Sequence, residues 1–137
     1  MPQIHATCVA ISGQGVLIRG PSGSGKSDLA LRLIDEGADL VADDYCNIAF
    51  ESGRLIATPP PAIAGKLEVR GIGILQMPHT NIVAIRLVVD LRTTQEIERL
   101  PETATTFIEN VPVPWISIDP RTASATAKVR VALSSLA

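Results

Sequence analysis

Apolar residues in this chain fall into short runs separated by glycine, proline and polar residues, a pattern typical of β-strands. The first runs predict strands over residues 4–11, 15–19 and 39–44. Between the last two lies a segment, residues 27–36, whose leucines and isoleucine recur on one helical face. We therefore expect a helix there, ended by Gly37, a residue suited to stop a helix.

The remaining runs predict a strand-rich chain with one further long helix. Residues 59–61 are three prolines, for which we expect an extended loop. Thr122 or Ser124 could cap the last helix. Because strands outnumber long helices and do not alternate regularly with them, the predicted fold class is α/β with a mixed sheet, in one domain over residues 1–137. The predicted elements are strands at 45–50, 54–57, 67–70, 82–91, 105–109 and 113–118, with turns at 12–15, 51–53 and 110–112, and helices at 93–99 and 123–136.

Composition narrows the classes of protein. Hydrophobic residues make up 46% of the chain, enough for a substantial aliphatic core, and the formal net charge is −2. With no basic run, nucleic acid is not an expected partner. No apolar run is long enough for a membrane span and no signal peptide is evident, so we expect a cytoplasmic protein. Cys8 and Cys46 are too few for a metal or disulfide framework and are expected to be buried thiols.

The chemistry is concentrated in one glycine-rich stretch that fits the phosphate-binding pattern G-x-x-x-x-G-K-[ST] at every fixed position. The glycines free the backbone so that successive N–H groups can converge on phosphate oxygens. Lysine would contact the β- and γ-phosphates and serine would bind Mg²⁺. The following helix would direct its N-terminus at the phosphates. The residues are Gly20, Pro21, Ser22, Gly23, Ser24, Gly25, Lys26 and Ser27.

The alternative interpretation of this stretch is a glycine-rich turn between strand and helix that binds nothing. It is disfavoured because Lys26 and Ser27 are both in register and both flanks have the required character. We therefore expect the chain to bind a nucleoside triphosphate, ATP, or a close analogue.

Charged residues follow two of the predicted strands. Asp43 and Asp44 end the strand after the helix, where one carboxylate could hold Mg²⁺ and the other could accept a proton from an attacking hydroxyl. A solvated acidic turn is the alternative. Glu68 and Arg70 would share one face of an extended segment, offering a metal ligand and a counter-charge for phosphate. A surface ion pair is the alternative there.

Together these segments resemble the catalytic domain of the bacterial HPr kinase/phosphorylase family, whose members are serine kinases. The resemblance extends over nearly the whole chain, and the segment at 67–74 is the most family-specific part. The matching segments are His5, residues 20–27, 40–44, 67–74, 98–100 and 119–121.

The resemblance implies roles that the residues alone do not fix. Asp44 would be the proton acceptor, with Asp43 its neighbour, and Glu68 would be a Mg²⁺ ligand. His5 and Arg99 match active-site positions. The implied reaction is ATP- and Mg²⁺-dependent phosphorylation of a serine on the small phosphocarrier protein HPr. The enzymes of the family assemble as hexamers.

The family also removes this phosphate with inorganic phosphate, releasing pyrophosphate, and Arg121 falls in a segment associated with that reaction. The chain departs from the family there. The connection after Leu75 is short, and the segment at 119–122 is only partly kept. The chain is therefore expected to act principally as a kinase.

Two other functions fit a phosphate-binding loop. A small-metabolite kinase is one, although such enzymes commonly need an arginine-rich lid and this chain has no insertion of that length. A non-catalytic nucleotide-binding regulatory module is the other, and the retained pair Asp43 and Asp44 argues against it.

Overall fold

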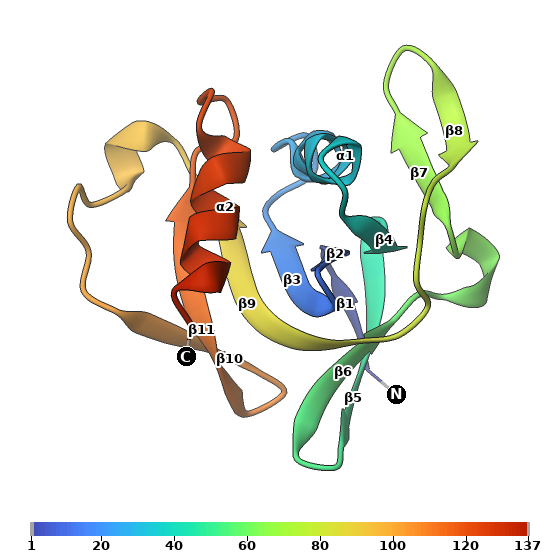
Figure 1. The fold of residues 1–137 in the computed structure, drawn as a ribbon, viewed down its shortest axis with the longest axis horizontal. Helices are drawn as coiled ribbons and strands as arrows, with labels where there is room; N and C mark the ends of the chain where they lie inside the picture. Colours follow the sequence, from blue (N-terminus) through green and yellow to red (C-terminus); the bar gives the residue numbers. More distant parts are fainter. Residues whose placement is uncertain (1, 137) are drawn as a thin grey trace.

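A nine-stranded mixed sheet forms the centre of the computed structural model, which describes residues 2–136 (Figure 1). Its strand order is β1-β5-β6-β9-β3-β2-β4, and β11 joins β9 while carrying β10 on its other side. A separate two-stranded hairpin is formed by β7 and β8. The strands are β1 (Gln3–His5), β2 (Thr7–Ile11), β3 (Gln14–Arg19), β4 (Asp39–Ala42), β5 (Tyr45–Glu51), β6 (Arg54–Thr58), β7 (Lys66–Val69), β8 (Gly73–Gln76), β9 (Val83–Leu91), β10 (Ala104–Ile108) and β11 (Val111–Ile118).

The long strand β9 holds the sheet together. Its first residues, Val83 and Ala84, pair antiparallel with β6, whereas its last four pair in parallel with β11. On its other side it runs parallel to β3. Figure 1 shows β9 curving away from β6 until its second half lies between β3 and β11. The predicted mixed sheet is therefore confirmed.

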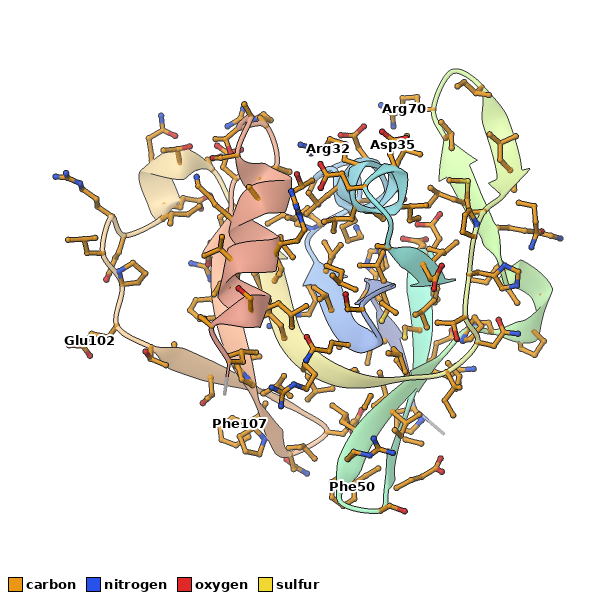
Figure 2. All side chains as sticks on the ribbon, viewed as in Figure 1. Arg32, Asp35, Phe50, Arg70, Glu102 and Phe107 are labelled. Atoms are coloured by element: carbon orange, nitrogen blue, oxygen red, sulfur yellow. The ribbon has the colours of Figure 1, made fainter. Side chains whose placement is uncertain are left out.

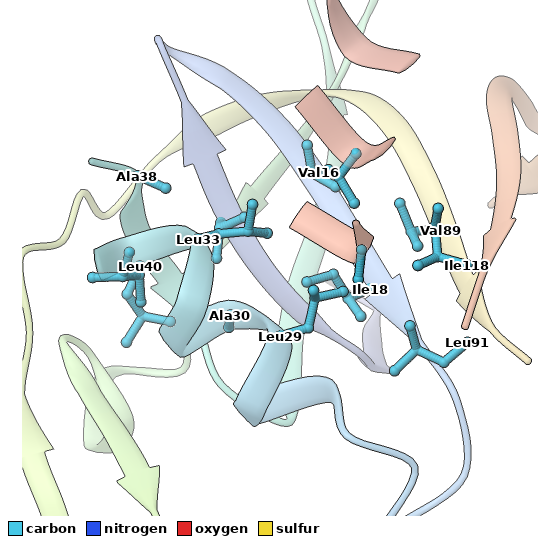
Figure 3. Close-up of a cluster of buried hydrophobic side chains, with 14 of the residues drawn as sticks. Val16, Ile18, Leu29, Ala30, Leu33, Ala38, Leu40, Val89, Leu91 and Ile118 are labelled. Atoms are coloured by element: carbon cyan, nitrogen blue, oxygen red, sulfur yellow. The ribbon is translucent and has the colours of Figure 1, made fainter. Parts of the chain in front are cut away.

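Two helices, α1 (Lys26–Asp35) and α2 (Ala125–Ser134), cover one face of this sheet. Leu29, Leu33 and Ile34 of α1 are buried there, as the helical spacing predicts. They pack with Val16 and Ile18 of β3 (Figure 3). Leu17, between these two residues in β3, faces a second apolar cluster on the opposite side of the sheet. Strand β3 therefore lies between two cores and fixes the position of the loop that follows it.

Three predicted hairpins are present, with tighter turns than expected. Ser12 and Gly13 join β2 to β3, and both have positive φ, as a two-residue hairpin turn favours. The turn before β11 consists of Glu109 and Asn110, with φ of 47° and 66°. The prediction of a turn at residues 110–112 was therefore wrong, because asparagine takes the left-handed conformation and Pro112 is free to join the strand.

Other boundaries also differ from the predictions. The strand expected over residues 4–11 breaks at the buried Ala6, because β1 pairs with β5 whereas β2 pairs with β3 and β4. The helix expected over residues 93–99 is a single 3-10 turn, η2 (Thr94–Glu96), since Ile97 is already extended. The proline loop leads into another such turn, η1 (Pro61–Ile63).

The start of α2 also corrects a prediction. Ser124 precedes the helix but makes no side-chain cap hydrogen bond, and the hydroxyl of Thr122 donates to the carbonyl of Asp119 instead. Neither residue is therefore the side-chain cap that the sequence suggested.

The two cysteines are free and buried, as predicted. Cys46 beside it and burial raise the pKa of the Cys8 thiol well above its ordinary value. Within residues 2–136, no helix is both long enough and apolar enough to cross a membrane.

Candidate active site

The glycine-rich loop connects the end of β3 to the start of α1. Gly23 and Gly25 have φ of 82° and 104°, in the left-handed region that favours glycine. Gly20 does not, so the expectation of an unusual backbone there was wrong. Its requirement is steric, because a Cβ atom at Gly20 would lie 2.5 Å from Oγ of Ser24. The loop folds tightly over its own first residue, and Pro120 packs against Gly25.

Lys26 is enclosed by this loop. Its ammonium nitrogen Nζ donates to the carbonyl oxygens of Gly20 at 2.8 Å and Pro21 at 3.2 Å, and the residue is only 5% exposed. Lys26 is also the first residue of α1, whose N-terminus has no side-chain cap. The lysine charge and the free N–H groups of the helix end therefore converge at one place, a strong arrangement for an anion.

Asp43, directly after β4, connects three parts of the chain. Its Oδ1 accepts hydrogen bonds from the hydroxyls of Ser27 at 2.7 Å and Thr7 at 3.3 Å. Its Oδ2 accepts the backbone N–H of Glu68 at 3.3 Å. The residue is 9% exposed, and a buried carboxylate needs partners of this kind. Asp43 thus joins α1, β2 and β7.

Asp44 has the opposite environment. Its side chain is 52% exposed, and its Oδ1 lies 2.7 Å from Nε2 of His5 on β1. Its φ of 70° is left-handed, and its backbone N–H donates to Oγ1 of Thr7 at 3.0 Å. The His5 ring also packs beside the ring of Tyr45. Of two adjacent carboxylates, one is buried with three donors and the other is accessible beside a histidine.

The β7–β8 hairpin brings further predicted residues close to Asp43. Leu67 and Val69 are buried whereas Glu68 and Arg70 are exposed, which confirms the predicted alternation. Arg70 follows the end of β7 (Figure 2). A hollow of about 320 Å³ is lined by residues 68–74. The hydrogen bond from the Glu68 N–H to Asp43 places this hollow next to the aspartate pair.

Residues 119–121 border the loop on another side. Asp119 is 5% exposed and accepts hydrogen bonds from Arg121 and Thr94. The Arg121 guanidinium, followed by the Thr94 hydroxyl, holds the pKa of Asp119 well below its ordinary value. The carboxylate therefore stabilises the fold at neutral pH, and this contribution is lost only as the pH falls through the lowered pKa. The Arg121 side chain is 73% exposed.

The structure does not bring every predicted residue together. Arg99 is exposed in the connection between η2 and β10. Among the described residues, no hydrogen bond or ion pair joins Arg99, Arg70 or Arg121 to the aspartate pair. Of the predicted site residues, His5 is therefore hydrogen-bonded to Asp44 and Ser27 to Asp43, whereas the three arginines bond to neither aspartate in the part of the chain that the structure describes.

The predicted metal ligands Ser27, Asp43 and Glu68 fit a magnesium ion in part. The oxygens of Ser27 and Asp43 are adjacent, and Mg²⁺ prefers one or two carboxylates together with substrate phosphates. Glu68 contacts Asp43 through its backbone rather than its carboxylate. In the described part of the chain, no group of three or more His, Cys, Asp or Glu side chains is arranged to hold a metal. The oxygens of Ser27 and Asp43 therefore suit a Mg²⁺ ion whose remaining ligands would come from a bound nucleotide.

The sequence matches a known family model over residues 1–134, that of the HPr Serine kinase C-terminal domain. The chain belongs to this family. Among solved structures, the HPr(Ser) kinase/phosphatase from Coxiella burnetii superposes with a TM-score of 0.83 at 28% identity, covering 96% of this chain and 87% of that one. The resemblance inferred from the residues is therefore confirmed.

Two curated relatives of this chain are longer proteins. The HPr kinase/phosphorylase of Clostridium tetani is 43% identical over 91 residues, which is 66% of this chain and 29% of that protein. The HPr kinase/phosphorylase of Limosilactobacillus reuteri is 37% identical over 134 residues, 87% of this chain and 41% of that protein. The chain thus spans less than half of their length.

The sequence did not indicate two residues that lie near this site, Thr7 and Arg32. Thr7 contacts both aspartates, but threonine is an ordinary strand residue and its neighbours gave no signal. Arg32 lies 3.2 Å from Asp28 and donates to the carbonyl of Pro120 at 2.6 Å. The spacing of Asp28 and Arg32 could have indicated the ion pair. The bond to Pro120 joins segments too distant in sequence to predict.

Proposed function

We propose that this domain is an ATP- and Mg²⁺-dependent protein kinase that phosphorylates a serine of an HPr-type phosphocarrier protein. The observation that carries the proposal is the contrast between Asp43 and Asp44 beside the loop of Lys26. One carboxylate is bonded to Ser27 on the loop side, and its neighbour faces solvent where a substrate hydroxyl could approach. Family membership supplies the class of acceptor.

On the nucleotide side, residues 20–27 would bind the ATP phosphates. Lys26 would place its charge against the β- and γ-phosphates, with the N-terminus of α1 beside it. Ser27 and Asp43 would hold Mg²⁺, with Glu68 as the proposed third ligand. When bound, the ion neutralises phosphate charge. The exposed Arg70 is proposed to balance the charge of the phosphoryl oxygens.

On the acceptor side, Asp44 would take the proton of the serine hydroxyl. His5 at 2.7 Å would hold the Asp44 carboxylate in one orientation. Because the Asp44 side chain is half exposed, a protein substrate could reach it. Arg121, exposed on the segment that borders the loop, is proposed to contact phosphoserine in the reverse reaction. Arg99 is proposed as an active-site residue. The proposal for Arg99 rests on the resemblance alone.

The same resemblance supports a homo-oligomer, a hexamer, working in the cytoplasm. These are proposals about assembly and location, and the chemistry proposed for the site does not depend on them.

The function is tested by incubating the domain with γ-labelled ATP, Mg²⁺ and purified HPr. We expect one labelled serine on HPr, mapped by peptide mass spectrometry, and no transfer when EDTA removes the metal. Label that passes to small metabolites instead would favour a metabolite kinase. Nucleotide binding without any turnover would favour a regulatory module.

The reverse reaction is expected to be weak or absent. Inorganic phosphate would have to occupy the β-phosphate position in the loop beside Lys26, where its oxygen could attack the phosphoserine phosphoryl group at the γ-position. The bond from phosphorus to the serine oxygen would break, the serine oxygen would take a proton, and pyrophosphate would leave. The segments expected to hold phosphoserine are short: β9 begins at Val83, soon after β8 ends at Gln76, and the Arg121 segment is only partly kept. The measurement is pyrophosphate release from phosphoserine-HPr in excess phosphate. A rate equal to the kinase rate would contradict this prediction.

A further inference from the structure

The hydroxyl of Thr7 lies between the two aspartates. Thr7 is fully buried in β2. Its Oγ1 donates to Oδ1 of Asp43 at 3.3 Å and accepts the backbone N–H of Asp44 at 3.0 Å. One side chain thus contacts the carboxylate of the first aspartate and the backbone of the second.

Packing alone does not require a hydroxyl at this position. Thr7 lies on the same face of β2 as Val9, which belongs to the apolar cluster beneath α1. A valine would occupy nearly the same volume there, without the cost of burying a polar group. A hydroxyl supplies one donor proton and accepting lone pairs, and both capacities are used here. The threonine is therefore explained by the aspartates and not by the core.

The bond to the Asp44 N–H bears directly on the orientation of Asp44. Asp44 has a φ of 70°, a conformation that residues other than glycine rarely adopt. This turn of the backbone follows β4 and leaves the side chain 2.7 Å from His5. The Thr7 hydroxyl holds the turn from the neighbouring strand through the backbone N–H of Asp44.

We infer that Thr7 is a positioning residue, which sets the Asp44 carboxylate for phosphoryl transfer by fixing the backbone of Asp44 relative to Asp43. The inference rests on the proposed kinase function. Thr7 itself touches no substrate, since it is buried behind both aspartates. Its influence on the reaction passes through Asp44, while Asp43 keeps its donors Ser27 and Glu68.

The test compares Thr7→Val, which removes the hydroxyl, with Thr7→Ser, which keeps it. Thr7→Val is expected to lower kcat about 10- to 100-fold, the usual effect of losing a group that orients a site residue. ATP affinity by isothermal titration should stay close to that of the unchanged protein. Thr7→Ser keeps the hydroxyl and should therefore have a kcat close to that of the unchanged protein. A matched control is Thr126→Val, because Thr126 is also buried and its hydroxyl also donates to a carboxylate, that of Glu36, at the far end of α1. It should leave kcat unchanged.

A second measurement needs neither nucleotide nor metal. Hydrogen exchange of the Asp44 amide, followed by NMR, should be slow in the unchanged protein and in Thr7→Ser. It should be about tenfold faster in Thr7→Val, as expected for the loss of one hydrogen bond. If Thr7→Val does not fold, Thr7→Cys replaces it, because a thiol is a weak acceptor of similar size.

The outcomes separate this inference from the proposed function. Unchanged kcat and unchanged Asp44 exchange in a folded Thr7→Val or Thr7→Cys variant would overturn the inference while the kinase function stands. If the unchanged protein transfers no phosphate to HPr, the proposed function fails. The exchange comparison then still decides whether Thr7 fixes the backbone of Asp44. If Thr7→Ser lowers kcat as much as Thr7→Val does, the inference is also overturned, because the hydroxyl is then not the group that matters.

Discussion

Lys26→Ala is expected to abolish nucleotide binding while the domain stays folded. The Lys26 ammonium group is held by two loop carbonyls at the N-terminus of α1, so its charge is already in place before a nucleotide arrives. Alanine removes that charge, and the carbonyls of Gly20 and Pro21 would then face the phosphates with no cation between them. The hydrogen bonds of the Lys26 ammonium group go to loop carbonyls, and alanine is the best helix-forming residue, so α1 and the core are expected to stay in place. Isothermal titration with ATP measures the loss.

The matched control for this prediction is Lys128→Ala, which removes an exposed lysine from α2. Its ATP affinity should equal that of the unchanged protein, because the charge lies outside the loop. Circular dichroism and the thermal midpoint establish that both variants are folded. Normal ATP affinity in a folded Lys26→Ala variant would show that the loop does not bind phosphate as proposed.

Asp44→Asn is expected to bind ATP almost normally and to transfer phosphate about 10²- to 10⁴-fold more slowly, the usual cost of losing a general base. Asparagine keeps the size of the side chain and tolerates the left-handed backbone at this position. It cannot accept the serine proton. Nucleotide affinity by titration and transfer in a single turnover separate the two effects.

Two comparisons sharpen this prediction. Asp39→Asn changes an exposed aspartate at the other end of β4 and should leave transfer unaffected. Asp43→Asn should instead weaken binding of the ATP–Mg²⁺ complex, because an amide nitrogen cannot accept the hydrogen bonds that Asp43 now receives. Full transfer activity in Asp44→Asn would remove the proposed role from that residue.

The sequence was informative where local pattern determines structure. The loop at 20–27 could be placed between a strand and a helix because glycine spacing, a buried strand and helical periodicity all agree over a short segment. The alternation in β7 likewise placed Glu68 and Arg70 on one side, as the structure confirms. The roles of these residues remain proposals.

What the sequence could not supply depends on contacts between distant segments. The break of the first strand at Ala6 follows from pairing with β5, some forty residues later. The opposite environments of Asp43 and Asp44 arise because Thr7, Ser27 and the backbone of Glu68 all meet one carboxylate. No local pattern distinguishes two adjacent aspartates in this way. The helix expected over residues 93–99 did not form for a related reason. A capping box closes one turn, but no residue of η2 is buried and Leu100 is exposed, so tertiary packing does not extend the turn into a helix.

The left-handed backbone at Asp44 also restricts how this gene can change over time. A residue other than glycine in that conformation costs about 1–3 kcal/mol, and aspartate and asparagine tolerate it best. A β-branched residue at position 44 would therefore harm the fold as well as any chemistry. If a descendant of this protein lost its need for the carboxylate, the accessible replacements would be asparagine and glycine. A copy carrying either one would keep its shape, and the replacement would mark a lineage that retained the scaffold after giving up the reaction.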